Sequence, residues 1–290
     1  MDAKQEQLMI GNFLTAHELH RFISDNLKES LASIGFSARL MTELVEALPN
    51  LDVEDFQKKF PAELTKVYEI EFFQKIVPHY FEQHVIPEIP ASGKILDVGC
   101  GTGILIQTLF KAGKFDQLTG IDINAYSEWK SFEKTGITFK VVLEKNFSKF
   151  LDEYGPDSIV LTWALHHMQY PEQERYLKNI VSKMKNGSLL IVLEDSYSQT
   201  LTPEHGEERW KAFMALGTKD RKIAMSVYDW IANRVLAQRK YVPIPFAYRT
   251  MEEWIELCRN IGLSLKSKKF IGFPEQRDIN TPQGLMVFRK

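Results

Sequence analysis

The chain has 290 residues, of which 44% are hydrophobic and 26% are charged, and its formal net charge is -2 with a sequence pI of about 6.4. This composition excludes a disordered chain and is sufficient for one large core with a small additional layer. The charge balance provides no basic field that would recruit nucleic acid or an anionic membrane surface. We therefore expect a globular protein that has neither nucleic acid nor membrane as a partner.

The first 89 residues have the pattern of a helical layer. Thr15-Ala16-His17-Glu18 reads as a capping box, and apolar residues follow it at helical spacing until Gly35. Two or three shorter helices are expected between there and Ile89. Such a layer either packs on a sheet as ordinary core or closes a pocket, and the two roles are compatible.

The sequence predicts a cytoplasmic protein. The N-terminal residues lack the charge and the apolar run of a signal peptide, and no segment is long and apolar enough to cross a bilayer. Cys100 and Cys258 are the two cysteines of the chain and form neither a disulfide framework nor a metal-ligand set. We therefore expect no bound metal.

Residues 94–103 read Lys-Ile-Leu-Asp-Val-Gly-Cys-Gly-Thr-Gly and predict a buried strand, a glycine turn and a helix over 104–111. Gly99, Gly101 and Gly103 allow positive φ and a close approach of a ligand to the backbone. The unpaired amides at the start of the helix favour polar or negative groups. The turn therefore predicts a site for a nucleotide-like molecule.

The glycine spacing indicates which nucleotide-like molecule the turn binds. A dinucleotide site requires Gly-x-Gly-x-x-Gly, whereas this turn has Gly-x-Gly-x-Gly, followed by Ile104 and Leu105. The stretch resembles motif I of the class I S-adenosylmethionine-dependent methyltransferases, small-molecule type, in which an apolar strand ends in Asp-x-Gly-x-Gly-x-Gly. The resemblance implies S-adenosylmethionine as cofactor and places Asp97 near its methionine part. A glycine turn of another α/β fold is the alternative.

A second strand is expected over 118–124 and ends in an acid about twenty residues after the glycine turn, as a ribose-binding strand should. A carboxylate at that position accepts hydrogen bonds from both ribose hydroxyls. The resemblance assigns this role to Asp122 and includes the adjacent Ile123 in the cofactor site. A solvated acid at a strand end is the alternative.

The third strand is expected over 137–142, where apolar and polar residues alternate. Members of the family commonly place an acid just after this strand, where it accepts from the adenine amino group. Glu144 is the nearest candidate, and the family's usual Gly-Asp-Ala sequence is absent at this point. A residue up to two positions away is the alternative.

Residues 157–168 resemble the family's fourth strand and the Leu-His-His segment of small-molecule methyltransferases. Trp163 would lie beneath the cofactor, where an aromatic face favours a sulfonium, or it would be ordinary core. His167 is the candidate general base, and His166 and His167 each have the alternative of satisfying backbone groups at a strand end.

The remaining pattern alternates helices and strands. A helix opens at Pro171, a strand covers 188–193, a capping box at Thr250 opens another helix, and two strands are expected near 263–271 and 285–289. This alternation predicts an α/β fold with a mostly parallel sheet flanked by helices. The resemblance makes it a Rossmann-like seven-stranded sheet with an antiparallel last strand.

The domain organisation follows from the long connections. Residues 1–89 are expected as an N-terminal helical cap, and residues 90–290 as the S-adenosylmethionine-binding domain. A connection over about 196–249 is far longer than a common loop and carries many aromatic and apolar groups. It is expected to form a helical lid or an extension of the core. A lid would keep water from the transferred methyl group.

Acids and polar groups at the carboxyl end of the fifth strand are expected on the substrate side. Glu194 is a second catalytic candidate, and Asp195, Tyr197 and Arg249 are candidates for substrate contact. The resulting hypothesis is methyl transfer from S-adenosylmethionine to an oxygen, nitrogen or carbon nucleophile of a small, partly apolar molecule. The alternatives are a non-catalytic protein that binds this cofactor as a regulator or partner, and an RNA or protein methyltransferase. The oligomeric state is left open.

Overall fold

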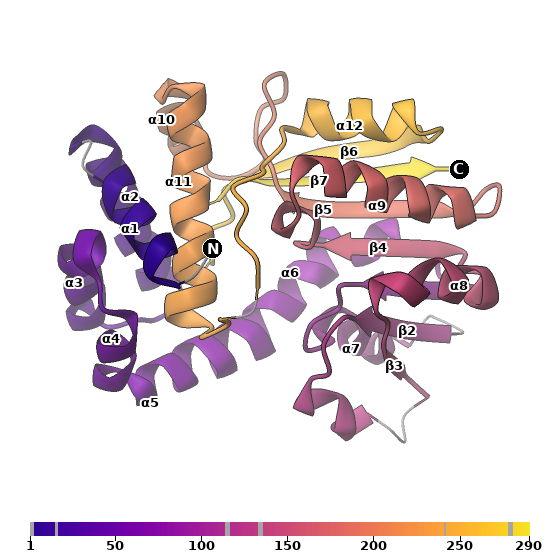
Figure 1. Ribbon diagram of the computed structural model, residues 1–290, viewed down its shortest axis with the longest axis horizontal. Coiled ribbons are helices and arrows are strands. Elements are labelled where there is room, and N and C mark those ends of the chain that lie inside the picture. Colours follow the sequence, from indigo (N-terminus) through magenta and orange to yellow (C-terminus); the bar gives the residue numbers. More distant parts are fainter. Residues whose placement is uncertain (1–2, 15–16, 114–116, 133–135, 241, 278–280) are drawn as a thin grey trace. The chain divides into compact units, whose positions relative to one another are not determined.

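The computed structural model describes residues 3–14, 17–113, 117–132, 136–240, 242–277 and 281–290, and Figure 1 draws its ribbon. The chain divides into two compact units, each built from segments that are distant in the sequence. Unit 1 consists of Met1–Ile76, Thr202–Tyr248 and Ile271–Pro282, and unit 2 of Val77–Leu201, Arg249–Phe270 and Gln283–Lys290.

The described residues form a seven-stranded sheet in the order β3-β2-β1-β4-β5-β7-β6. The strands are β1 (Lys94–Val98), β2 (Gln117–Asp122), β3 (Thr138–Val141), β4 (Ser158–Thr162), β5 (Leu189–Asp195), β6 (Ser264–Gly272) and β7 (Gln283–Arg289). The pairs among β1 to β5 are parallel, whereas β7 runs antiparallel to β5, with Leu193 opposite Leu285. The predicted Rossmann-like sheet with its antiparallel last strand is confirmed.

Continuous apolar runs explain why the central strands form. Every residue of β5 is buried, and β1 is buried from Ile95 onward, because helices cover a parallel sheet on both faces. Polar residues interrupt these runs only at the carboxyl ends, at Asp97, Glu194 and Asp195. These ends lie at one edge of the sheet, and that edge carries the candidate site.

The helices of unit 2 precede or connect the strands, as Figure 1 shows. They include α6 (Val77–His84), α7 (Ile104–Lys111), α8 (Glu144–Tyr154), α9 (Tyr170–Lys183) and α12 (Met251–Asn260). The predicted helix over 104–111 matches α7 at both ends. The capping box at Thr250 is formed, because Glu253 N donates to Thr250 Oγ1 at 3.2 Å and Thr250 N donates to Glu253 Oε2 at 2.7 Å.

Unit 1 is helical. Its elements are α1 (Ala3–Phe13), α2 (His17–Ser33), α3 (Ala38–Ala47), η1 (Leu48–Asn50), α4 (Val53–Lys59), α5 (Pro61–Glu63), η2 (Leu64–Ile76), α10 (Glu207–Ala215), α11 (Thr218–Trp230) and η6 (Ile231–Leu236). Helix α11 packs against α2, and the buried Arg234 forms a double hydrogen bond to Glu6 at 2.8 and 2.9 Å. The N-terminal helices and the 202–248 insertion are therefore parts of one unit.

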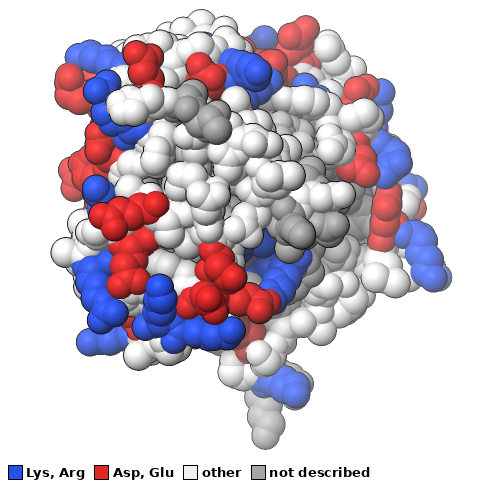
Figure 2. All heavy atoms as spheres, turned by 60° about the vertical axis from the view of Figure 1, so that its left-hand side comes forward, with Lys and Arg blue, Asp and Glu red and all other residues white. Residues whose placement is uncertain are grey.

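The cap and the lid are separate parts in the sequence pattern, and their roles stay predictions. The capping box expected at Thr15-Ala16-His17-Glu18 begins outside the described residues. Among the helices of the described residues, none combines the length and the apolar character that a membrane span requires. On the face drawn in Figure 2, acidic and basic side chains are interspersed. Ion pairs also occur within single helices, as between Lys211 and both Glu207 and Glu208 on α10, with N···O distances of 3.0 and 2.9 Å.

Candidate functional site

The glycine turn lies between β1 and α7, as predicted. Gly99, Gly101 and Gly103 have φ values of +75°, +52° and +85°, in the left-handed region that favours glycine. The amides of Gly99 and Cys100 both donate to the carbonyl oxygen of Ile121, at 2.9 and 3.0 Å. Strand β2 therefore anchors the start of the turn.

The peptide of Gly101 is held from two sides. Its amide donates to Asp122 Oδ2 at 3.0 Å, and its carbonyl oxygen accepts from Trp129 Nε1 at 2.9 Å. Asp122 is half-buried at the end of β2, and its second oxygen accepts from the amide of Asn124 at 3.0 Å. A Cβ added at Gly101 would meet no atom of the described residues within 4 Å, so this part of the chain leaves the turn open there.

Phe139 on β3 explains why two positions near the turn must be glycine. A Cβ at Gly103 would lie 2.4 Å from the Phe139 ring, and a Cβ at Gly120 would lie 2.8 Å from it. Trp129, in the 3-10 helix η4 (Ser127–Phe132), stacks on the same ring with centroids 5.2 Å apart and planes at 10°. Neither Trp129 nor Phe139 is among the site residues predicted from the sequence. The available signal is the aromatic residues that follow the second strand.

Asp97 is the next-to-last residue of β1, just before the glycine turn, and is 1% exposed. Burial, together with the charge of Asp122, raises the pKa of its carboxyl from the ordinary value of 3.8 to about 8. Its Oδ1 makes no hydrogen bond to the described residues. A buried polar atom without a partner is suited to a donor or cation on a ligand, so Asp97 fits the predicted cofactor site.

The predicted adenine side lies at the ends of β2 and β3. Ile123 is 61% exposed and follows Asp122, which lies opposite Val141 in the strand register. Glu144 is the first residue of α8 and forms an exposed ion pair with Arg175 at 2.8 Å. A hollow of about 340 Å³ lies between α8 and α9 and is lined by Glu144, Lys145, Arg175, Tyr176 and Asn179. The adenine role of Glu144 stays a prediction.

Trp163 directly follows β4 and has a φ of +50°, which is unusual for a bulky residue. Its ring stacks on Phe81 and Tyr80 of α6, with centroids 5.2 and 5.8 Å apart. Its Nε1 donates to Gln283 Oε1, and Gln283 Nε2 donates to Asp195 Oδ1. The structure thus joins Trp163 and Asp195, two predicted site residues, through Gln283 on β7.

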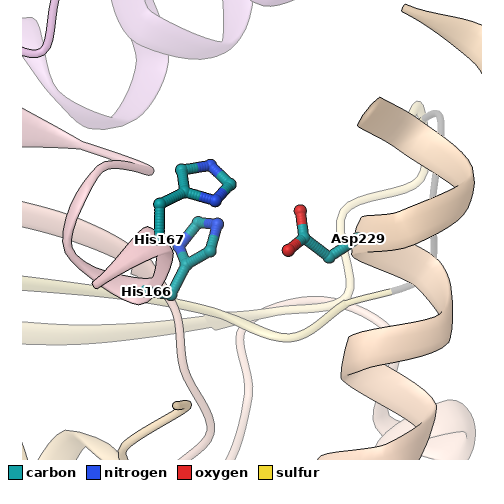
Figure 3. Close-up of side chains that lie close together, drawn as sticks. All are labelled: His166, His167 and Asp229. Carbon is teal, nitrogen blue, oxygen red and sulfur yellow. The ribbon is translucent and has the colours of Figure 1, made fainter. Parts of the chain in front are cut away.

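The turn after Trp163 carries two histidines. The turn is the 3-10 helix η5 (Leu165–His167), and the imidazole rings of His166 and His167 have centroids 4.1 Å apart (Figure 3). His166 is 3% exposed, and its Nδ1 lies 2.6 Å from Glu194 Oε2. Glu194 Oε1 accepts from the amides of Ala164 and Leu165 at 3.0 and 2.7 Å. Sequence reasoning proposed His167 and Glu194 and missed that the contact of Glu194 is to His166.

Asp229, also drawn in Figure 3, belongs to α11 of unit 1. Within that unit its carboxylate accepts from Tyr248 Oη at 2.9 Å and from Asn233 Nδ2 at 2.7 Å. It is therefore part of a buried polar network in the helical unit.

The substrate-side candidates lie between β5 and α12. The guanidinium of Arg249 lies over the rings of Tyr170 and Trp254, at 4.7 and 5.5 Å from their centroids, and its Nε donates to Gln173 Oε1 at 2.7 Å. Tyr197 is buried, and its carbonyl oxygen accepts from the amide of Met251 at 2.9 Å. These contacts fix both residues at the carboxyl edge of the sheet.

Comparison with known proteins gives one family and several distant relatives. A family model described as a methyltransferase domain matches residues 70–264. An uncharacterised methyltransferase of Oceanobacillus iheyensis is 31% identical over 122 residues, which are 41% of this chain and 54% of that protein. A carboxy-S-adenosyl-L-methionine synthase of Campylobacter fetus is 23% identical over 146 residues, covering 48% of this chain and 62% of the synthase. The chain thus spans between half and two thirds of the length of these curated relatives.

Solved structures with a similar fold have low sequence identity to this chain. The 1,6-didemethyltoxoflavin-N1-methyltransferase of Burkholderia thailandensis is 15% identical with a TM-score of 0.46, covering 86% of this chain and 89% of that one. A SAM-dependent methyltransferase of Archaeoglobus fulgidus is 14% identical with a TM-score of 0.48, covering 83% and 100%.

Proposed function

We propose, because this chain belongs to the methyltransferase-domain family, that it transfers the methyl group of S-adenosylmethionine to an oxygen, nitrogen or carbon nucleophile of a small, partly apolar molecule. When bound, the cofactor supplies a methyl group on a sulfonium, which is an activated leaving group. The chain's own task is then to bind and orient two reactants and to exclude water.

The observation that carries this proposal is the joint arrangement of the glycine turn and Asp122. The Gly101 peptide is fixed by Asp122 and Trp129, and no atom of the described part of the chain lies within 4 Å of where its Cβ would be. Among the described residues, each oxygen of Asp122 accepts one hydrogen bond and retains acceptor capacity for a ribose hydroxyl. Asp97 offers a buried carboxyl toward the amino group of the methionine part.

Calorimetric titration with S-adenosylhomocysteine tests the proposal. Loss of a hydrogen bond to a charged group is worth about 1.5–3 kcal/mol, so Asp122→Asn should weaken binding by roughly 10- to 100-fold. Asp152→Asn is the matched control, because Asp152 is exposed on α8 and pairs with Lys183. Binding of NADH with no binding of S-adenosylhomocysteine would contradict the proposal.

Turnover requires a second experiment. Labelled S-adenosylmethionine is incubated with the protein and a panel of phenols, amines and activated carbon acids, and product is separated from the cofactor. A methylated product supports the enzyme, whereas tight binding with no product across a metabolite extract would favour a regulatory protein. A product on RNA or protein would replace the small-molecule substrate.

The compartment and the partners belong to the same proposal. Cys100 and Cys258 are both free thiols, which suits a reducing cytoplasm. A small-molecule substrate without a nucleic-acid partner agrees with the interspersed surface charges on the face in Figure 2.

A further inference from the structure

Three neighbouring strands of the sheet are connected by side chains at one edge. Strand β5 lies between β4 and β7, and its last residue, Asp195, lies opposite Gln283, the first residue of β7. Trp163 directly follows β4, and its backbone amide donates to the carbonyl oxygen of Leu193 on β5 at 2.9 Å. Trp163, Asp195 and Gln283 therefore come from three adjacent strands and meet at the carboxyl edge.

The hydrogen bonds among these side chains have one possible direction. The indole Nε1 of Trp163 can only donate, so the Gln283 amide must present its Oε1 to the indole. Its Nε2 then donates to Asp195 Oδ1. Gln283 is 0% exposed and Asp195 is 4% exposed, and hydrogen bonds in such buried surroundings polarise one another. The carboxylate of Asp195 thus acts on the indole through the oriented amide of Gln283.

The backbone of Trp163 is held in an unfavourable conformation. Its φ of +50° is rare for a bulky residue and persists only where surrounding contacts enforce it, which is common at ligand sites. The next residue, Ala164, lies against the glycine turn, because a Cβ added at Gly99 would be 3.1 Å from the Ala164 Cβ. Gln283 therefore anchors a strained residue directly beside the predicted cofactor site.

We propose that Gln283 is a positioning residue for cofactor recognition, which ties the indole of Trp163 to Asp195 and keeps the ring where its face meets the positive charge of the sulfonium. The inference rests on the proposed function, and it assigns a role to β7, a strand on which the sequence places no site residue. A cation over the face of an indole is attracted by the ring quadrupole. The neutral sulfur of S-adenosylhomocysteine lacks this attraction, so the arrangement favours the methyl donor over the product.

The anchoring is measured without cofactor, by hydrogen exchange of the indole N–H in NMR spectra of the full chain labelled with ¹⁵N-tryptophan. The chain has five tryptophans, and the signal of Trp163 is the one lost in Trp163→Phe. Gln283→Met keeps the length of the side chain and removes its amide, so exchange of the Trp163 indole should become roughly 10-fold faster. Gln117→Met, an exposed change on β2, should leave the rate unchanged. An unchanged rate in folded Gln283→Met would overturn the proposal.

Recognition is measured by calorimetric titration with S-adenosylmethionine and with S-adenosylhomocysteine, which differ by the methyl group and its charge. A cation–π contact contributes about 0.5–2 kcal/mol, so Gln283→Met should lower the preference for S-adenosylmethionine by about 2- to 30-fold. A general loosening of the site would weaken both ligands by the same factor. Equal weakening would therefore show a purely structural role for Gln283 and overturn the proposal.

Asp195→Asn tests the same row of hydrogen bonds without changing Gln283. The new side chain retains an oxygen for the Gln283 amide and removes the negative charge, so the preference for S-adenosylmethionine should fall by a smaller factor. If Gln283→Met does not fold, fast exchange of the wild-type Trp163 indole or an unchanged preference in Asp195→Asn would overturn the proposal. Absence of binding of both ligands to the wild type would instead refute the proposed function, and the exchange result would stand independently.

Discussion

The glycine turn after β1 and the histidine turn after β4 follow neighbouring strands of the same sheet, and different forces hold them. The first uses three glycines with positive φ and contacts from residues within about one β-α-β unit, including Ile121, Asp122 and Trp129. The second has no glycine and contains Trp163 at a φ of +50°, and Glu194 on β5 holds it. Backbone freedom shapes one turn, whereas a buried side chain from another strand shapes the other.

Glu194→Ala should have the largest effect on stability. It leaves the amides of Ala164 and Leu165 and the ring of His166 without their acceptor inside the protein, and breaking such a buried network costs about 4 kcal/mol. The free energy of unfolding in urea measures the loss. Glu256→Ala on the exposed face of α12 should change it by less than about 0.5 kcal/mol. Similar values for the two variants would show that the histidine turn does not depend on Glu194.

Gly103→Ala breaks the other turn. The new Cβ would lie 2.4 Å from the Phe139 ring at a φ of +85°, so strain and overpacking together should cost about 3 kcal/mol in urea unfolding. Gly113→Ala is the matched control, because Gly113 has a φ of +65° and no atom of the described residues lies within 4 Å of its added Cβ. Its cost should be about 1 kcal/mol, which is the conformational part alone. Equal costs would remove Phe139 from the explanation.

Thr250→Ala adds to the two turns a third feature, the N-terminal cap of α12, which depends only on local sequence. The hydroxyl caps α12 through the amide of Glu253, and loss of such a cap costs about 1 kcal/mol. Thr250→Ser keeps the hydroxyl and should retain most of the stability, again measured by urea unfolding. A full loss in the serine variant would indicate that the Thr250 methyl group, rather than the cap, stabilises the helix.

The smallest effect is a fraction of a proton released on cofactor binding. The pKa of Asp97 is raised to about 8 by burial and by Asp122, so the free protein carries a mostly protonated Asp97 at pH 7. A bound ammonium group nearby would lower that pKa and release the proton. Titrations with S-adenosylhomocysteine at pH 7, in buffers of different ionisation enthalpy, measure the release. Asp97→Asn should abolish it, and the same release in that variant would assign the proton to another group.

Asp97 also gives stability a pH dependence of unusual sign. Because its folded pKa lies above the unfolded value of 3.8, the folded state binds more protons than the unfolded chain between about pH 4 and pH 8. This contribution therefore falls as pH rises through that window. Unfolding curves for Asp97→Asn should lack this component.

The elements that the sequence predicts correctly are those that depend on residues close together in the chain. Glycine spacing and apolar periodicity act within a few residues, so the strand at residues 94–98 and the helix at 104–111 agree with the structure. The capping box of α12 is equally local. The antiparallel last strand came from the family resemblance, because its pairing with β5 joins residues that are nearly a hundred positions apart.

Contacts that depend on the folded chain could not be predicted. The Trp129 indole on Gly101 comes from the connection between β2 and β3, the Phe139 ring against Gly103 comes from β3, and no motif marks either residue. Glu194 was identified by its place at a strand end, but its buried partners were not, because 28 residues separate it from His166. The assembly of unit 1 could not be predicted either, because its segments are distant in the sequence and each has its own pattern.

The segmented construction of unit 1 has a consequence for synthesis of the protein. Glu6 and Arg234 form a buried pair across 228 positions, and the hydroxyl of Tyr228 reaches the carbonyl of Ile23 across 205. On the ribosome, the apolar faces of α1 and α2 therefore emerge long before α11 and η6, which complete their core. The nascent N-terminal helices present exposed hydrophobic surface throughout synthesis of the sheet, which makes this stage the one most dependent on chaperones.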